Sequence, residues 1–230
     1  MPTNDYNAWE SRWNEGRIGF HRDSVNPHLV TYLNHLKRTG AKEIAVPLCG
    51  KSLDLIWLKE QDWNVTGIEL VQKAIHEFFS YWNKRPTRSD IENRPNYRHE
   101  NLNMLNADIF DLPVSLNGQF DAIYDRAAIV ALPPAMRIRY ADILLKLLKP
   151  GGRALIITYE APTAPDSGPP YNVYEEEIPN LFSSCRTKLL ESFHYLPESE
   201  PKLKIRGLAW CKEQIWLVES TKTTLARRPI

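Results

Sequence analysis

The sequence lacks the features that mark several large classes of protein. Its three cysteines, Cys49, Cys185 and Cys211, are widely spaced, so they offer neither a disulfide framework nor a paired zinc site. The net charge of +1 provides no strong field to attract nucleic acid. No apolar run approaches the about 20 residues of a membrane span, and the polar N-terminus has no apolar signal segment. We therefore expect a cytoplasmic protein with no nucleic-acid or membrane partner.

Motifs for several kinds of catalysis are also missing. The six histidines show no metal-ligand spacing, so no metal is expected, and without a G-x-S-x-G elbow a serine hydrolase has no support. No heptad or long apolar patch indicates self-association, so we expect a monomer. The hydrophobic fraction of 43% and the seven tryptophans are typical of a globular enzyme. The length suits a single domain over residues 1–220, with a helical N-terminal extension or lid at 1–40 and a disordered tail at 221–230.

The stretch Glu43–Glu69 reads as strand, tight turn, helix, strand and acid. An apolar strand at Ile44–Val46 is followed by a turn at Pro47–Gly50, and Ser52 is expected to cap the next helix. This order is typical of one half of a nucleotide-binding sheet, in which the helix N-terminus and the acid, here Glu69, bind the cofactor's polar groups. The helix is expected to bury one face, made of Leu53, Ile56 and Trp57.

The turn itself narrows the choice of cofactor. It contains only Gly50, where a dinucleotide fingerprint needs three glycines, and Pro47 and Leu48 obstruct the approach of a pyrophosphate. S-adenosylmethionine, which has an adenosine but no phosphate, tolerates such a loop. An alternative is a phosphate-binding loop that ends in Gly50-Lys51-Ser52, but Ala45 occupies the place of its first glycine.

The rest of the chain alternates between helix and strand patterns. Helices are expected at Pro27–Lys37, Ala74–Trp82, Pro133–Leu147 and Val173–Phe182, and strands at Leu102–Ala107, Gln119–Asp125 and Arg153–Thr158. Lys188–His194 and Gln214–Glu219 are expected to form an antiparallel pair. The polar stretch Asn83–Asn101 has no periodicity and is interpreted as a surface loop.

Several side chains are placed for chemistry by this arrangement. Asp125 and Arg126 follow a strand, where the ligand crevice of such a sheet lies, and Asp108 follows another strand on the expected adenine side. The rigid, proline-rich segment Ala161–Tyr171 is expected to wall a substrate pocket. Two interpretations stay open for the N-terminal aromatic residues Trp9, Trp13 and Phe20: they pack over a sheet edge, or they form a lid over cofactor and substrate.

Separate motifs along the chain resemble the thiopurine S-methyltransferases. They are W-x-x-x-W-x-x-G-x-x-x-F-H at Trp9–His21, P-L-C-G-K-S at Pro47–Ser52, G-I-E-L at Gly67–Leu70, D-I-F-D-L-P at Asp108–Pro113, D-R-A-A-I-V-A-L at Asp125–Leu132, G-P-P-Y at Gly168–Tyr171 and E-Q-I-W-L at Glu213–Leu217. Their order and spacing make the resemblance specific, and it covers nearly the whole chain. The stretches 83–101 and 202–206 do not align clearly.

The resemblance implies an α/β fold, a Rossmann-like doubly wound sheet of seven mostly parallel strands with an antiparallel last strand and helices on both faces. It implies methyl transfer from S-adenosylmethionine, with S-adenosylhomocysteine as product, to a small-molecule thiol or a related sulfur, selenium or tellurium nucleophile. By position, the residues that match the family's cofactor contacts are Trp9, Leu48, Glu69, Ile109 and Arg126. Trp13 and Asp108 neighbour them, and Gly50 of the turn is a further candidate for cofactor binding. Phe20 matches the family's substrate-side aromatic residue, and Lys202 or Arg206 could supply its basic substrate residue.

The chemistry assigns further roles and leaves alternatives. Arg126 is the candidate cation for an anionic sulfur, because a guanidinium stays charged, while Asp125 or Asp23 could act as a base through a water. A methyltransferase acting on oxygen or nitrogen is one alternative, and a non-catalytic cofactor-binding protein of the same fold is another.

Overall fold

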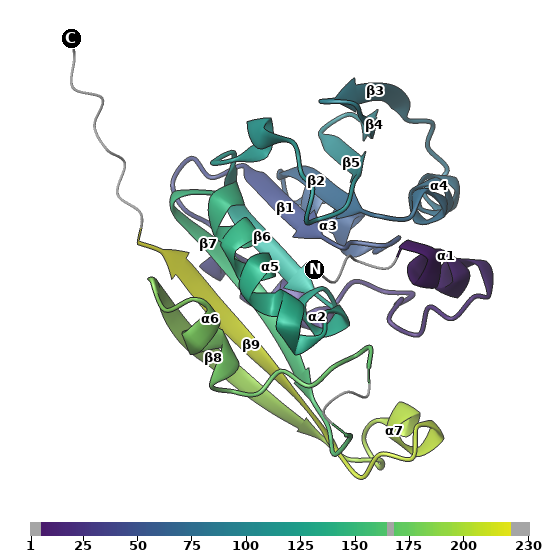
Figure 1. Cartoon of the computed structure of the whole chain (residues 1–230), viewed down its shortest axis with the longest axis vertical. Coiled ribbons are helices and arrows are strands. Elements are labelled where there is room, and N and C mark those ends of the chain that lie inside the picture. Colours follow the sequence, from purple (N-terminus) through teal and green to yellow (C-terminus); the bar gives the residue numbers. More distant parts are fainter. Residues whose placement is uncertain (1–5, 165–167, 222–230) are drawn as a thin grey trace.

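The computed structural model describes residues 6–164 and 168–221, except for the side chain of Lys202. These residues form one mixed sheet of nine strands in the order β3-β4-β5-β2-β1-β6-β7-β9-β8, with helices packed on it (Figure 1). The strands are β1 (Glu43–Pro47), β2 (Asn64–Glu69), β3 (Thr87–Ile91), β4 (Arg94–His99), β5 (Leu102–Asn106), β6 (Phe120–Arg126), β7 (Leu148–Glu160), β8 (Cys185–Tyr195) and β9 (Cys211–Ser220).

The middle of the sheet is parallel and its flanks are antiparallel. Strands β5, β2, β1, β6 and β7 pair in parallel, so their carboxyl ends meet along one edge of the sheet. Strand β9 is antiparallel to both β7 and β8, and β4 is antiparallel to β3 and β5. The expected count of seven strands was therefore wrong, and antiparallel pairing is not confined to the last strand.

The two additional strands come from the polar stretch that was interpreted as a surface loop. Residues 83–101 contain the hairpin of β3 and β4, whose turn residues Glu92 and Asn93 both have left-handed backbone angles, with φ of 46° and 65°. The side chains of β3 are mostly exposed, so the strand has no apolar alternation to reveal it. The backbone hydrogen bonds that join β3 to β4 do not require apolar alternation, because the backbone of any residue except proline can both donate and accept them.

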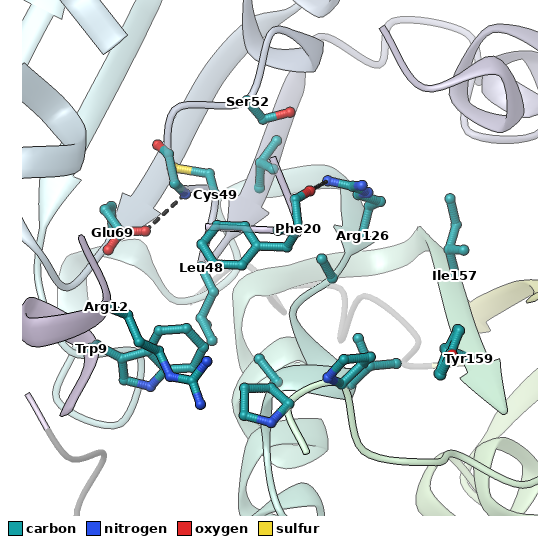
Figure 2. A pocket seen from close by; sticks show the side chains of 18 of the residues that line it. Trp9, Arg12, Phe20, Leu48, Cys49, Ser52, Glu69, Arg126, Ile157 and Tyr159 are labelled. Carbon is teal, nitrogen blue, oxygen red and sulfur yellow. Dashed lines mark hydrogen bonds between the residues drawn. The ribbon is translucent and has the colours of Figure 1, made fainter. Parts of the chain in front are cut away.

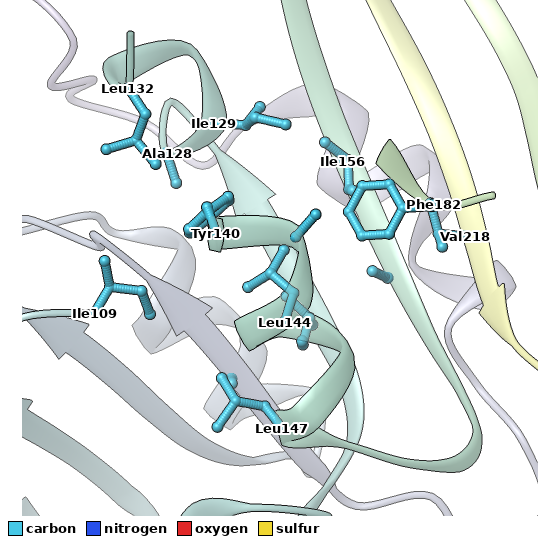
Figure 3. Close-up of a cluster of buried hydrophobic side chains, with 14 of the residues drawn as sticks. Ile109, Ala128, Ile129, Leu132, Tyr140, Leu144, Leu147, Ile156, Phe182 and Val218 are labelled. Carbon is cyan, nitrogen blue, oxygen red and sulfur yellow. The ribbon is translucent and has the colours of Figure 1, made fainter. Parts of the chain in front are cut away.

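Helices cover both faces of the sheet, and the two faces bury separate groups of side chains. On one side α5 (Pro134–Leu147) and α6 (Glu177–Leu181) pack on Ile123, Ile156 and Val218, as Figure 3 shows in part. On the other side α2 (Pro27–Tyr32), α3 (Asp54–Glu60) and α4 (Gln72–Tyr81) pack on alternate residues of the same strands. Such alternation is the pattern that a sheet buried on both faces requires.

Several helix predictions need correction in their details. The buried side chains of α3 are Asp54, Leu55 and Leu58, whereas the expected face of Leu53, Ile56 and Trp57 is only half-buried. Apolar spacing alone predicted the wrong buried face, because this short helix has neighbours on two sides. The Ser52 hydroxyl does accept a hydrogen bond from the N–H of Asp54, at 3.3 Å, but it lies one residue before the cap position.

Other boundaries differ by a few residues. Helix α2 ends at Tyr32 and continues as a 3₁₀ turn over Leu33–His35, and α6 is shorter than the expected Val173–Phe182. The remaining helices are α1 (Tyr6–Asn14) and α7 (Pro201–Ile205), with 3₁₀ turns at Val114–Leu116 and Ile129–Ala131. Of the expected tail only Thr221 is described, and residues 222–230 lie outside the described part. None of the helices in the described part is both long enough and apolar enough to cross a membrane.

Asp125 belongs to the core and not to the crevice. Its side chain is fully buried, and its two oxygens accept hydrogen bonds from the Tyr140 hydroxyl at 2.7 Å and from the Ile129 N–H at 3.1 Å. Burial raises the pKa of this carboxyl to about 6. The expected catalytic role is corrected accordingly: Asp125 joins β6 to the turn after it and to α5.

We predict that Asp125→Ala lowers the free energy of unfolding by about 2–3 kcal/mol, because two buried donors lose their acceptor. Urea denaturation of both proteins measures the difference. Asp142→Ala, the same change at an exposed position of α5, should change the free energy by only a few tenths of a kcal/mol. An unfolding free energy unchanged by Asp125→Ala would contradict the structural role.

Candidate active site

A pocket of about 370 Å³ opens at the carboxyl ends of the parallel strands (Figure 2). Its floor consists of residues from the ends of β1, β2, β6 and β7, and its roof comes from α1 and the segment that follows it. Two prolines of the proline-rich segment, Pro169 and Pro170, form part of the wall, as expected for that segment. The volume lies within the range of about 300–1,000 Å³ that is usual for small-molecule sites.

One end of the pocket is built around the carboxylate of Glu69. Its oxygens accept hydrogen bonds from the N–H of Gly50 and of Val71, each at 2.8 Å, so the end of β2 holds the turn after β1 in place. Burial raises the pKa of Glu69 to about 7. Gly50 has a φ of +55°, and a Cβ there would lie 3.3 Å from the Trp13 ring, so this position favours glycine.

The roof is made of three aromatic side chains. Trp9 and Trp13 on α1 both meet Phe20 edge to face, with ring centroids 6.2 and 5.9 Å apart. The same cluster packs on Val71, just before α4, and on Ala74 within α4. These residues therefore both pack on the fold and line the pocket, and their role as a lid over cofactor and substrate stays a prediction.

Arg126 ties this roof to the sheet. It ends β6, and its Nη1 donates a hydrogen bond to the backbone oxygen of Phe20 at 2.7 Å (Figure 2). The next residue, Ala127, has a left-handed backbone with φ of 61°, which turns the chain sharply away after the strand. The guanidinium thus both lines the pocket and holds the N-terminal segment over it.

The other end of the pocket is polar and was largely missed by sequence reasoning. The Tyr124 hydroxyl donates to Asp54 Oδ2 at 3.0 Å, and Arg206 Nη1 donates to the Tyr159 hydroxyl at 3.1 Å. Glu213 also lines this region. These residues come from α3, β6, β7, β9 and the position just after α7, so no local motif unites them; only Arg206 was expected here.

Not every expected site residue reaches the pocket. Ile109 is buried in the core, and Asp108 Oδ1 accepts a hydrogen bond from the N–H of Phe110 at 2.9 Å, which makes it a turn residue outside the pocket wall. The side chain of Lys202 lies outside the described residues. The pocket wall does include Trp9, Trp13, Phe20, Leu48, Gly50, Glu69, Arg126 and Arg206. Within the described part, no three His, Cys, Asp or Glu side chains are grouped to hold a metal ion.

Comparison with solved structures shows which fold this is. A methyltransferase of Burkholderia thailandensis that acts on N1 of 1,6-didemethyltoxoflavin, solved with that compound and S-adenosylhomocysteine, superposes with a TM-score of 0.64. The match covers 94% of this chain and 87% of the other, at 18% sequence identity. At that identity the likeness establishes an α/β methyltransferase fold.

Comparison of sequences gives a closer relationship. A curated thiopurine S-methyltransferase of Legionella pneumophila (strain Corby) is 41% identical over 211 residues, which cover 91% of this chain and 96% of that protein. Another, from Vibrio parahaemolyticus, is 39% identical and covers 94% of this chain and 99% of that protein. The sequence model of the thiopurine S-methyltransferase family matches residues 4–221. The chain therefore belongs to the thiopurine S-methyltransferase family of methyltransferase enzymes.

Proposed function

We propose that this enzyme transfers a methyl group from S-adenosylmethionine to the sulfur of a small-molecule thiol, or to a related soft sulfur, selenium or tellurium nucleophile. The observation that carries the proposal is the pocket with two unlike ends. A carboxylate bonded to a tight glycine turn lies at one end, and an aromatic, arginine-bearing chamber lies at the other. Membership of the family supports the same reading.

The residues at the Glu69 end fit the cofactor by their chemistry. Glu69 would accept hydrogen bonds from ribose hydroxyls, while Leu48 and Trp9 offer apolar surface to the adenine and the thioether chain. Gly50 has no side chain, so the backbone of the turn can come close to the ligand. When bound, S-adenosylmethionine supplies an electrophilic methyl group on a positively charged sulfur.

The protein's main task in such a transfer is to align the reactants. A thiolate is already a strong nucleophile, and correct orientation alone can contribute roughly 7–11 kcal/mol to the barrier reduction. Arg126 would hold the roof in place and provide positive charge near an anionic sulfur. Arg206, beside Tyr159 at the far end, supplies a second positive charge.

The phosphate-binding alternative loses support from the position of Lys51. Its Nζ makes an ion pair with Glu77 at 2.8 Å and lies 5.8 Å from the centre of the Trp13 ring. A lysine of a phosphate-binding loop must instead reach the phosphates. Titration calorimetry with S-adenosylhomocysteine and, separately, with ATP distinguishes the two functions. Micromolar binding of the first compound alone, followed by methylation of a thiol from a panel, is the expected result, and binding of ATP alone would overturn the proposal.

We predict that S-adenosylhomocysteine binds up to about tenfold more weakly at pH 6 than at pH 8. The pKa of Glu69 is raised to about 7, so the carboxyl is ionised above pH 7 and takes up a proton as the pH falls through 7. The neutral acid is a weaker acceptor for ribose hydroxyls. Calorimetry across this pH range measures the effect. Glu69→Gln should bind weakly at every pH, while the exposed control Glu60→Gln should keep the wild-type profile.

We predict that Arg126→Ala lowers kcat at saturating cofactor by about 10²-fold. The change removes both the positive charge and the bond that fixes the roof, and small misplacements of reactants cost about that much. Steady-state kinetics with a methylated thiol measures it. Arg139→Ala is a matched control, because Arg139 also donates to a backbone oxygen, that of Phe110 at 2.8 Å, but lies away from the pocket. An unchanged kcat in Arg126→Ala would contradict the assigned role.

A further inference from the structure

Three carboxylates line the pocket within the described part of the chain, and Glu213 is the one with an oxygen that has no hydrogen-bond partner among the described residues. Glu69 gives its two oxygens to backbone N–H groups. Asp54 accepts from the Asn26 N–H at 2.8 Å and from the Tyr124 hydroxyl at 3.0 Å. Glu213 uses Oε2 alone, and its Oε1 has no hydrogen-bond partner among the described residues. Its side chain is 32% exposed and lines the pocket.

A buried histidine holds Glu213 from behind. His28 Nε2 lies 3.1 Å from Glu213 Oε2, and the Tyr195 hydroxyl lies 3.4 Å from the same nitrogen. The imidazole is 9% exposed and packs against the Phe193 ring, with centroids 4.5 Å apart. This support fixes the direction of the carboxylate, as a second group does for a catalytic base in enzymes generally.

Glu213 lies at the substrate end of the pocket. Strand β9 pairs with β7 so that Glu213 is opposite Tyr159. In Figure 2 Tyr159 lies on the side of the pocket away from Glu69 and Trp9, with Phe20 and Arg126 between them. If the cofactor occupies the Glu69 end, the free oxygen of Glu213 faces the acceptor molecule. Neither Asp125 nor Asp23 is placed to act as the base, because Asp125 is buried in the core and Asp23 does not line the pocket.

We infer that Glu213 is the catalytic base for one class of acceptor, the heterocyclic thiones, with His28 as its positioning residue. The inference rests on the proposed function. A thione carries its proton on the ring nitrogen next to the C=S group, so its sulfur is neutral and a weak nucleophile. A carboxylate that accepts this N–H increases the electron density on sulfur and removes the proton that the product must lose. An ionised aromatic thiol has no such proton and does not need the base.

The step balances in atoms and charge. The substrate sulfur forms a bond to the methyl carbon, and the bond from that carbon to the cofactor sulfur breaks, with its electron pair remaining on the cofactor. The ring N–H bond breaks towards Glu213 Oε1, and its electron pair forms the C=N bond of the S-methyl product. The C=S double bond becomes a single bond at the same time, and its π electron pair supplies the new bond from sulfur to the methyl carbon. A cationic cofactor, a neutral thione and a carboxylate thus become a neutral thioether, a neutral product and a carboxylic acid, which returns its proton to water.

Other polar groups surround this carboxylate and set the conditions in which it works. Those that interact with it from the neighbouring elements are His28 on α2, Tyr195 on β8, Tyr159 on β7, Tyr124 on β6 and Cys211 on β9, and Arg206 after α7 lines the same pocket. The arginine is the positive charge among them, and it is bound to Tyr159.

The test compares two acceptors in the same enzyme. Purine-6-thione carries the ring proton, whereas 4-nitrothiophenol is ionised at neutral pH and carries none. Glu213→Gln should lower kcat/KM for purine-6-thione by about 10²-fold and leave that for 4-nitrothiophenol within about twofold. The matched control on the same strand is Glu219→Gln, whose carboxylate pairs with Arg153 at 3.0 Å, remote from the pocket; neither acceptor should be affected.

Two further measurements separate a base from a merely structural residue. In Glu213→Gln the rate with purine-6-thione should rise with pH as the free thione ionises, which narrows the difference from wild type. Calorimetry with the S-adenosylhomocysteine complex of Glu213→Gln should show purine-6-thione binding about tenfold more weakly than in wild type, since a charge-assisted hydrogen bond is lost.

A second variant tests the positioning residue. His28→Phe should produce the same acceptor-selective loss to a smaller extent, and this variant tests the inference if Glu213→Gln does not fold.

The outcomes distinguish this inference from the function on which it rests. Turnover of both acceptors by wild type with an equal loss, or no loss, in Glu213→Gln overturns the role of Glu213 and leaves the methyltransferase proposal intact. Failure of wild type to methylate either acceptor overturns both. Selective loss with the thione alone supports both.

Discussion

The site depends on one buried carboxylate that joins the ends of two strands. Glu69 is the last residue of β2 and accepts a hydrogen bond from the backbone N–H of Gly50, in the turn after β1. Burying a carboxylate is costly, which is why its pKa rises, and two backbone donors offset part of that cost. The turn is thereby held in a conformation that presents its backbone and Leu48 to the pocket. The same carboxylate is the acceptor that we propose for a ligand's hydroxyl groups.

The position of the N-terminal segment depends in turn on this turn after β1. Trp13 packs against Gly50, Phe20 packs against Trp13, and the backbone of Phe20 is bonded by Arg126 at the end of β6. The aromatic roof is therefore attached to two different strands of the sheet. A roof of this kind excludes water, and in a drier pocket the charges of Arg126 and Glu213 act more strongly on a ligand.

Some parts of the fold and the site follow from local sequence. The apolar run before Pro47, the turn and the acid at Glu69 indicate one half of an α/β sheet, and the separated motifs identify the family. Local pattern is less reliable where pairing does not depend on side chains. The hairpin of β3 and β4 is polar, and backbone hydrogen bonds hold its strands together. The buried face of α3 was predicted wrongly, because the helix packs on two sides.

By itself, the sequence determined the order of the elements outside residues 83–101, the tight turn after β1 and the position of Glu69 at the end of β2, because each is encoded in residues close together in the chain. The tertiary structure decided which side chains share the pocket. Asp125 and Arg126 are adjacent in sequence, yet alternation along β6 sends the first into the core and the second into the pocket. Glu213 and His28 are 185 residues apart and meet only because β9 lies beside β7 and α2 packs against that part of the sheet.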